Sequence, residues 1–540
     1  MNTPEAGPAS STSTNATTSA TEERLLANAA VPPAVSKTTK NPKVADRDKS
    51  VVVSGKKHAV EVAGPENPDG TDGSPRVLFD PNDPIIREFG PLFSIDGDKI
   101  KLNPPALGAK FVTEHQFRFD DSDGSFRQYS KVTGVWEPLR EPKVKLALAA
   151  FIKALADHYQ VEKLTMMRTN SLLGAILALA KGYKGMGEPD AAAGPLIHVA
   201  NGVLDLSTGE AVLRGFSADD WSTSACDIGW NGGAKCDRFL NELLTPALNA
   251  DDIDLLQRYA GSLLFGLNAA QRFQVLHGGA SSGKSTLVTI LERIVGVANV
   301  AHLRTQHLTG RFESHGFQGK KLLTAKDVPS NFLGNTGAKA LKALVGADLI
   351  ETEQKFGDKF QLRGNLNIIV TSNGRLRLPL EDDEGAWRRR LLVLDFSRKE
   401  KAKRISNFED VLWNEEGEGI LAWMVEGAVK HLAELKKDGD FRLTPAQLER
   451  IENLLLESRS VVEFITGGVV KKAKADVSVD ELLRGYVEFC HEKKWEPVSS
   501  REFTLKLTDL MIRTHGIYKR NDVQREGSSV RGFKGIALAS

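Results

Sequence analysis

Long apolar segments, paired cysteines and an excess of one charge are all absent from this sequence of 540 residues. No apolar run approaches the ~20 residues needed to cross a bilayer, so we expect no membrane partner. The formal net charge is only +1, so a nucleic-acid-binding surface would have to be a local patch. The first 30 residues lack the apolar core of a secretory signal, and we therefore expect a cytoplasmic protein.

Cysteine is scarce as well. The three cysteines are Cys226, Cys236 and Cys490, and none forms a C-x2-C pair. An odd and widely spaced set argues against both a disulfide framework and a zinc site. We expect reduced thiols, as in a cytoplasmic protein.

Composition separates a leader from a globular remainder. Residues 1–78 are rich in Ser, Thr, Ala, Pro and Gly and have almost no aromatic side chains, so we predict a disordered leader. This leader would act as a tether, as a partner-binding tail or simply as a solvated segment. Beyond it, apolar periodicity predicts a hairpin over 117–129, helices over 143–182, a strand and turn over 197–206, and helices over 236–268 and 403–457. Thr444 followed by Pro445 marks a helix start inside the last of these segments.

A glycine-rich loop is the most informative motif. It fits the pattern G-x4-G-K-[ST] and comprises Gly278, Gly279, Ala280, Ser281, Ser282, Gly283, Lys284, Ser285 and Thr286. A strand candidate, Phe273–Leu276, precedes it, and apolar residues at helical spacing follow as far as a stop at Gly296. Strand, glycine-rich turn and helix form the geometry that binds phosphate through backbone N–H groups and a helix N-terminus.

The same motif predicts ATP and Mg²⁺ as cofactors. Lys284 would pair with the β- and γ-phosphates, and the Ser285 hydroxyl would ligate Mg²⁺. A plain glycine-rich loop is the alternative.

Two later strands end in polar residues. The apolar segment 317–327 ends at Asp327, which suits a residue that engages Mg²⁺ or the attacking water. The segment 366–373 ends at Asn373, which would hydrogen-bond the γ-phosphate or the water. A surface aspartate after a buried strand and a turn asparagine are the plain alternatives.

Arg388, Arg389 and Arg390 precede a further strand, 391–396. Arginines beside a core strand are costly if they are buried without a partner, so they favour contact with an anion. A solvated charge run is the alternative.

This order of motifs resembles superfamily 3 helicases, in particular the phage and plasmid primase–helicase branch that includes the poxvirus enzyme. The resemblance extends from about residue 110 to the C-terminus. It rests on the loop, on Asn373, on the paired Arg389 and Arg390, and on weaker flanking segments: His198–Leu206, Leu344–Asp348 with Glu351, Lys355, Phe356 and Phe360, and Val461–Ile465 through Phe533.

The resemblance implies an α/β fold with an AAA+-like P-loop NTPase core, an N-terminal α+β domain and a C-terminal winged-helix-like domain. The implied boundaries are a linker-like domain over 79–235, a helical collar over 236–268, the ATPase core over 269–400, a helical extension over 401–457 and the DNA-binding domain over 458–540. No polymerase-like domain is visible, so we expect a helicase without a primase half.

The implied assembly is a homo-oligomeric, hexameric ring with ATP between subunits and single-stranded or forked DNA as partner. Lys355, at a hairpin tip, would contact DNA phosphates, and Phe356 would pack against the strand. A solvated turn lysine is the alternative for Lys355. Arg389 or Arg390 would reach the neighbouring subunit's ATP, with Arg389 favoured. A separate primase or replication initiator is a further expected partner.

Two positions depart from the family pattern. Lys326-Asp327 stands where the family has an acidic pair or Ser-Glu, so Asp327 would serve alone and hydrolysis would be weak or unusual. Asp395 replaces a proline before Phe396, and we expect little effect from it.

The sequence from Arg501 to Lys534 contains eight basic residues and four acidic ones. Arg525 and Arg531 lie in a predicted hairpin with a glycine turn, the shape of a wing, and would contact DNA phosphates. A solvated face is the alternative for this patch.

Three functions fit the sequence. The first is an ATP-dependent DNA helicase for replication of a phage, prophage or plasmid-like element. The second is a non-translocating, ATP-dependent origin-binding or loader protein with weak hydrolysis. The third is a P-loop kinase of small molecules, against which the arginine run and the basic C-terminal segment argue.

Overall fold

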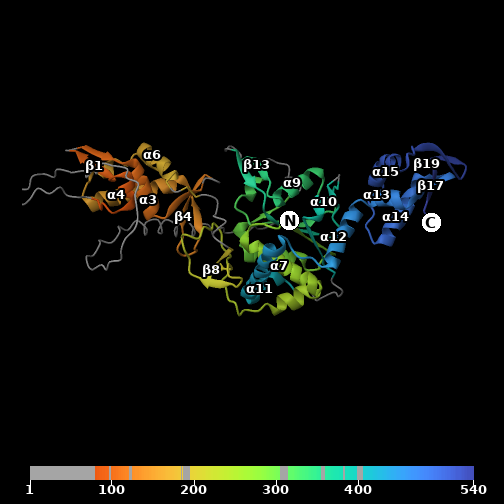
Figure 1. Cartoon of the computed structure of the whole chain (residues 1–540), viewed down its shortest axis with the longest axis horizontal. Helices are drawn as coiled ribbons and strands as arrows, with labels where there is room; N and C mark the ends of the chain where they lie inside the picture. The colour runs from red at the N-terminus through yellow and green to blue at the C-terminus, as the bar shows by residue number, and fades with distance from the viewer. Residues whose placement is uncertain are drawn as a thin grey trace, which may run out of the picture. The chain divides into compact units, whose positions relative to one another are not determined.

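The computed structural model describes residues 79–539, except 97–98, 121–123, 184, 187–194, 305–313, 354–358, 381–382 and 398–404. Contacts divide the chain into two units. The first comprises residues 1–192 with 217–221, and the second comprises 193–216 with 222–540. Figure 1 shows the first unit in orange and the second from yellow to blue. Our finer domain boundaries stay predictions.

The first unit combines helices with a mostly antiparallel sheet, in which only the β3–β6 pair is parallel among the described strands. Its helices are α2 (Pro84–Phe89), α3 (Pro104–Glu114), α4 (Glu141–Tyr159), α5 (Lys163–Met166) and α6 (Asn170–Lys181). A hairpin, β1 (Phe93–Asp96) with β2 (Lys99–Leu102), lies beside a sheet in the order β5-β4-β3-β6, made of Trp136–Leu139, Ser125–Tyr129, Phe117–Asp120 and Gly185–Met186. Phe119 pairs with Phe126, so the predicted hairpin over 117–129 is confirmed.

Helix starts in this unit follow from local chemistry. Asp83 and Asn103 each accept a hydrogen bond from a backbone N–H of the first turn, and proline follows each of them. Proline at the first helical position has no N–H to leave unpaired and already has a helical φ. The aromatic and aliphatic faces of α3, α4 and α6 then close one core around Phe111, Phe126, Leu148, Phe151 and Ile176.

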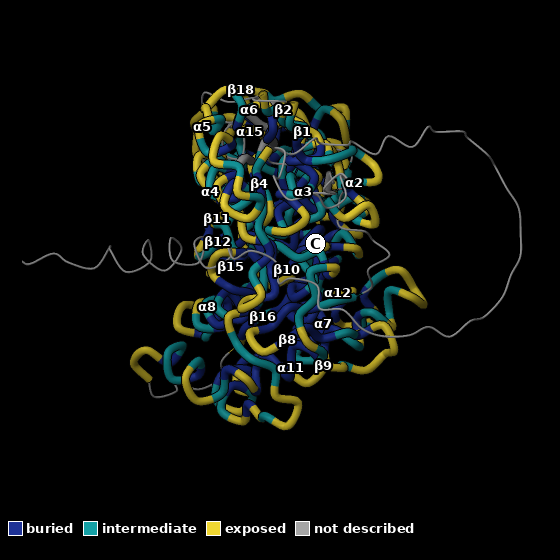
Figure 2. The backbone as a smooth tube through the Cα atoms, turned by 90° about the vertical axis from the view of Figure 1, so that its left-hand side faces the viewer, coloured by how far each residue is buried: buried dark blue, intermediate teal, exposed yellow. Residues whose placement is uncertain are grey.

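A five-stranded parallel sheet is the centre of the second unit. Its order is β11-β12-β15-β10-β16, formed by Val300–His302, Leu322–Val328, Asn367–Ser372, Phe273–His277 and Leu391–Asp395. The predicted strands at 273–276, 317–327, 366–373 and 391–396 are therefore confirmed, with shifted ends. Continuous apolar runs suit strands that are buried on both faces, and Figure 2 shows β10, β15 and β16 in the dark blue of buried backbone.

Helices cover both faces of the sheet. One face carries α7 (Ala250–Phe265), α8 (Lys284–Val295) and α11 (Phe408–Asp438), together with the π-helical turn η2 (Phe239–Leu244). The other carries α9 (Asn335–Val345), α10 (Glu384–Arg388) and α12 (Pro445–Ser458). The fold class of this unit is α/β.

Helices α7 and α11 run side by side (Figure 1) because glycines let their backbones touch. A Cβ added to Gly427 would lie 2.0 Å from the Gln257 carbonyl oxygen, and one added to Gly261 would lie 2.1 Å from the Ala428 nitrogen. Any other residue at these two positions would force the helices apart.

Smaller elements complete the second unit. A three-stranded antiparallel sheet contains β7 (Leu196–Val199), β8 (Gly202–Asp205) and β9 (Val212–Arg214). A separate hairpin pairs β13 (Leu349–Glu353) with β14 (Lys359–Arg363). Short 3-10 turns, η3 (Val297–Asn299) and η5 (Ser314–Phe317), lie before and after β11.

The C-terminal part of this unit has its own core. Its elements are α13 (Ser460–Gly467), β17 (Val469–Ser478), α14 (Val479–Lys493), α15 (Ser500–His515), β18 (Arg520–Arg525) and β19 (Ser528–Leu538). The strands form an antiparallel sheet in the order β17-β19-β18, and the predicted terminal hairpin is confirmed. Phe464, Tyr486, Phe503 and Phe533 are buried between the sheet and the helices.

All three cysteines are buried and outside any disulfide. Burial raises the pKa of the Cys226 thiol to about 11 and of the Cys236 thiol to about 12. Among the described helices, none has the length and apolar composition of a membrane span.

Candidate nucleotide-binding site

The glycine-rich loop joins the end of β10 to the start of α8, as the sequence predicts. Gly278, Ser281 and Gly283 have φ values of +151°, +62° and +100°. A Cβ on Gly278 would lie 2.3 Å from the Phe396 carbonyl oxygen, so glycine is required there. Gly279 is exposed and has open space around its Cα. The loop is packed against the sheet at its ends and open in its middle, where a ligand can approach the backbone.

Lys284 is buried at the first position of α8, and its side chain turns back into the loop. Its Nζ donates to the carbonyl oxygens of Gly278 and Gly279 at 2.6 and 2.9 Å, to the Ser282 Oγ at 3.1 Å and to the Asn373 Oδ1 at 3.2 Å. Burial lowers the pKa of the Lys284 ammonium, and the Asp327 carboxylate opposes this shift. The loop therefore holds a cation beside the N-terminus of a helix, and both attract phosphate.

Three neighbouring parallel strands deliver the polar residues. Strand β15 lies between β10 and β12, so the ends that carry Asn373, the glycine loop and Asp327 meet at one edge. Asp327 is exposed, has a φ of +50°, and donates its backbone N–H to the Thr371 Oγ1 at 2.8 Å. The pairing register between β12 and β15 shifts at this point. The structure thus brings Lys284, Asp327 and Asn373 together.

The positive charge of the unusual Lys326 is neutralised by an acid of α8. Its Nζ donates to the Glu292 Oε2 at 2.7 Å and to the Thr289 Oγ1 at 3.2 Å, both on α8. The Thr324 hydroxyl donates to the other Glu292 oxygen at 2.7 Å. Glu292 is buried, and the sequence reading missed it. The sequence does contain a signal for Glu292, because it is an acidic residue among apolar ones on the helix that follows the loop.

Oxygen donors suitable for Mg²⁺ are few at this edge. Ser285 is exposed in the first turn of α8, and Asp327 is the carboxylate at the end of β12. Across the described chain, no group of three or more His, Cys, Asp or Glu side chains gathers as a metal site. Mg²⁺ commonly takes one or two protein oxygens together with substrate phosphates and water, so these residues fit a shared ion rather than a protein cage.

The three arginines have three different environments. Arg388 is exposed and pairs with Glu384 and Glu452. Arg390 is buried, with 7% of its surface exposed, and donates to the Ala386 carbonyl oxygen at 3.0 Å. Burial, followed by the positive charge of Arg389, lowers the pKa of Arg390.

Arg389 differs from both. It is exposed, and within the described residues it makes no ion pair. Of the three side chains, Arg389 is the one that is both exposed and outside any ion pair of the described residues.

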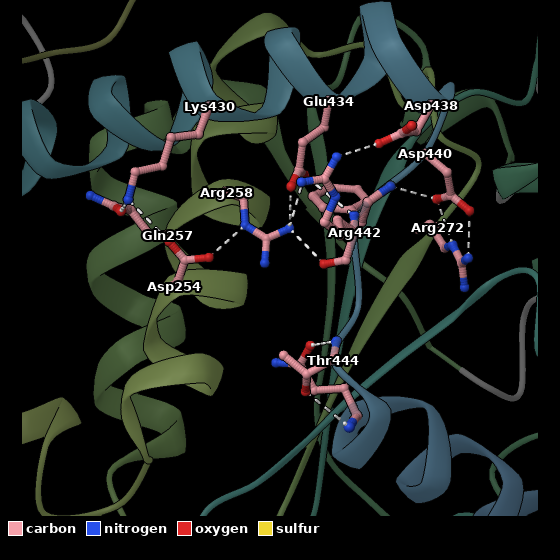
Figure 3. A network of polar contacts seen from close by, with 12 residues as sticks. Asp254, Gln257, Arg258, Arg272, Lys430, Glu434, Asp438, Asp440, Arg442 and Thr444 are labelled. Carbon is pink, nitrogen blue, oxygen red and sulfur yellow. Dashed lines mark hydrogen bonds and ion pairs between the residues drawn. The ribbon is translucent and has the colours of Figure 1, made fainter.

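Arg272 holds the backbone of the arginine segment. Its Nη1 donates to the carbonyl oxygens of Arg388 and Leu391 at 3.2 and 3.1 Å. Its Nε and Nη2 donate to the two Asp440 oxygens at 2.9 and 2.5 Å. Figure 3 shows this pair beside the contacts of Arg258 with Glu434. Asp440 lies 168 residues beyond Arg272, so no local pattern could reveal the pair.

Asp395 also has a structural role that the sequence reading underestimated. Its carboxylate lies 3.0 Å from the His277 Nδ1 and 3.3 Å from the Arg450 Nε. Arg450 in turn pairs with the buried Asp252. These contacts tie the residue before the glycine loop to α12 and α7, and they lower the pKa of Asp395 against the opposing effect of burial.

The remaining predicted contacts lie elsewhere. Lys355 and Phe356, which come after β13 and before β14 in the sequence, lie outside the described residues. Arg525 donates to Glu481 and Asp476, so its role in DNA binding stays a prediction that these contacts do not favour. Arg531 is exposed on β19.

One family model and several solved structures are similar to this chain. A family model described as a family of unknown function, DUF5906, matches residues 276–390, about a fifth of the chain. No curated protein matches the sequence. Three similar solved structures are apo forms of the NrS-1 C-terminal region. They are 10–12% identical, with TM-scores of 0.38–0.40, and the match covers 80–81% of this chain and 98–100% of theirs.

Proposed function

We propose that this chain binds ATP with Mg²⁺ at the loop Gly278–Thr286 and hydrolyses it to move along DNA. One observation carries the nucleotide part of the proposal. The Lys284 ammonium lies inside a glycine loop and contacts Asn373, which follows the neighbouring strand. Two residues 89 positions apart thus converge where a terminal phosphate would lie.

Each residue of the site has a distinct role in this proposal. Lys284 and the loop N–H groups bind the β- and γ-phosphates. Ser285 and Asp327 are the residues that would hold Mg²⁺, which neutralises phosphate charge. Asn373 orients the attacking water. As water adds to the γ-phosphorus, the bond to the β-γ bridging oxygen breaks, and ADP and phosphate leave.

The proposed assembly is a homo-oligomeric, AAA+-like ring, hexameric by the family resemblance. Arg389 supplies positive charge to the neighbouring subunit's γ-phosphoryl group, because it is exposed and, unlike the equally exposed Arg388, is not held in an ion pair among the described residues. The helices and sheet of 460–538 are the proposed winged-helix-like DNA-binding domain, with the β18–β19 hairpin as wing. In this proposal the protein acts as a superfamily 3 helicase on single-stranded or forked DNA during replication of a phage, prophage or plasmid-like element. A separate primase or initiator would cooperate with it.

The small number of carboxylates beside Lys284 favours a second function. Asp327 is the one carboxylate that the described structure places beside Lys284, because Glu292 is occupied by Lys326 and Thr324. With one acid to serve both metal and water, hydrolysis would be slow. The protein would then load or bind at an origin without translocation.

DNA-stimulated ATP turnover and strand separation on a forked substrate test the proposal. We expect turnover that rises with single-stranded DNA, and unwinding that stops in Lys284→Ala. ATP binding with negligible turnover and no unwinding would favour the origin-binding function. Absence of ATP binding by the folded wild-type chain would overturn both.

A further inference from the structure

Strand β17 carries a basic protrusion in the C-terminal domain. Its pairing with β19 is regular from Val469 to Lys471 and again from Asp476 to Ser478. Between these stretches, residues 472–475 of β17 face only Gly535 of β19. The sequence of the protruding residues is Lys-Ala-Lys-Ala, and Lys471 directly precedes them.

The protrusion is on an edge of the sheet and is open to solvent. In the strand order β17-β19-β18, strand β17 has one neighbour. Lys471, Lys472 and Lys474 are all exposed, and Lys474 has a φ of +66°. A lysine seldom adopts this left-handed conformation, and such outliers gather at functional sites.

Several other cations of the C-terminal domain are held in ion pairs. Arg525 pairs with Glu481 and Asp476, while Arg520 and Lys534 share Asp522. Lys506 and Arg513 pair with acids one helical turn away. In contrast, no ion pair to Lys471, Lys472 or Lys474 is present among the residues that the structure describes. No acidic residue occurs from Val469 to Ala475.

We propose that the segment Lys471–Ala475, the β17 protrusion, binds the phosphate backbone of DNA. This inference rests on the proposed function and names the surface through which the C-terminal domain meets its partner. Free ammonium groups on a projecting backbone neutralise phosphates without reading sequence, and each neutralised phosphate releases condensed counterions. Lysines on a bulged edge strand also prevent sheets from pairing edge to edge, and this alternative role does not require the lysines to bind DNA. The salt dependence of DNA binding distinguishes the phosphate-binding role from the edge-protecting role.

The test uses the full chain with an ATP analogue that is slowly hydrolysed and a fluorescent oligothymidylate. The dissociation constant is measured across a range of salt concentrations for the wild type and for Lys471→Gln/Lys472→Gln/Lys474→Gln. We expect weaker binding and a log–log salt slope shallower by about 2, since each single-strand phosphate contact contributes about 0.7. An unchanged slope in the folded triple variant would overturn the inference.

Two further variants sharpen the result. Deletion of residues 472–474 leaves one residue opposite Gly535, removes two lysines, and should make the slope shallower by about 1.4. Lys436→Gln/Lys437→Gln, at the exposed end of α11, is the matched control and should keep the wild-type slope. If the wild type itself fails to bind DNA, the proposed function fails. If it binds and the deletion keeps its slope, only the assignment of this surface fails.

Discussion

At the scale of single residues, we expect the adjacent Arg389 and Arg390 to have different roles. Arg389 is exposed, whereas Arg390 is buried within reach of the charges of Asp348 and Asp383. The family resemblance already favours Arg389 as the residue that acts on a neighbouring site, and the two side chains differ in burial.

We predict that Arg389→Ala lowers ATP turnover without changing stability. A guanidinium that stabilises charge on the γ-phosphoryl group is worth about 10³–10⁵ in rate. Arg390→Ala should instead destabilise the fold by about 1–3 kcal/mol, since it removes a buried side chain from its partners. Turnover assays and urea unfolding on both variants check this. Equal loss of stability in the two variants would contradict the distinction.

His431 gives a second prediction at this scale. Its ring stacks on the Phe441 ring, with 4.1 Å between the ring centroids. Burial, followed by the positive charge of Arg258, lowers the pKa of His431 from 6.5 to about 4, and the negative charge of Asp440 opposes this shift. The folded protein therefore favours neutral His431. The stability it contributes is complete above about pH 6.5 and is lost as the pH falls toward 4, by about 2 kcal/mol at pH 5.

The measurement is the free energy of unfolding at pH 7 and pH 5 for the wild type and His431→Phe. Phenylalanine does not titrate, so the variant should lose less stability between the two pH values. An identical loss would show that protonation of His431 does not drive the change.

At the scale of elements, close backbone contact between α7 and α11 should control the stability of the second unit. Gly427→Ala places a methyl group on the Gln257 carbonyl and should cost at least ~1–3 kcal/mol, because the helices must separate. Gly385→Ala is the matched control, since open space surrounds Gly385 in α10 and alanine favours helix. Thermal unfolding of both variants checks this. A Gly427→Ala variant as stable as Gly385→Ala would contradict the contact.

Much of the element level could be predicted from the sequence because its causes are local. The loop after β10, the stop of α8 at Gly296 and the capping box of Thr444 with Gln447 are each encoded within a few residues. The pairs that complete the site are not local. Asp440 meets Arg272, Arg450 meets Asp395, and Lys326 meets Glu292 only after the chain has folded. Side-chain charge alone gave no means to choose among the many possible partners.

At the scale of the whole molecule, the proposed ring makes one subunit complete another's site. Lys284→Ala and Arg389→Ala subunits should each be inactive alone. After mixing, some interfaces would join an intact Lys284 to an intact Arg389, and partial ATP turnover should return. The assay needs a mass measurement that confirms subunit exchange. If exchange occurs and no turnover returns, Arg389 does not act in trans.

The central claim is that the loop Gly278–Thr286 binds a nucleoside triphosphate. Its most direct test is an equilibrium titration of the full chain with a fluorescent ATP analogue and Mg²⁺. We predict saturable binding by the wild type and by the control Lys320→Ala, whose side chain bonds the Ala298 carbonyl oxygen. Lys284→Ala should bind at least about tenfold more weakly, because it loses the charge that meets the phosphates. Equal affinity of the wild type and a folded Lys284→Ala variant would contradict the account.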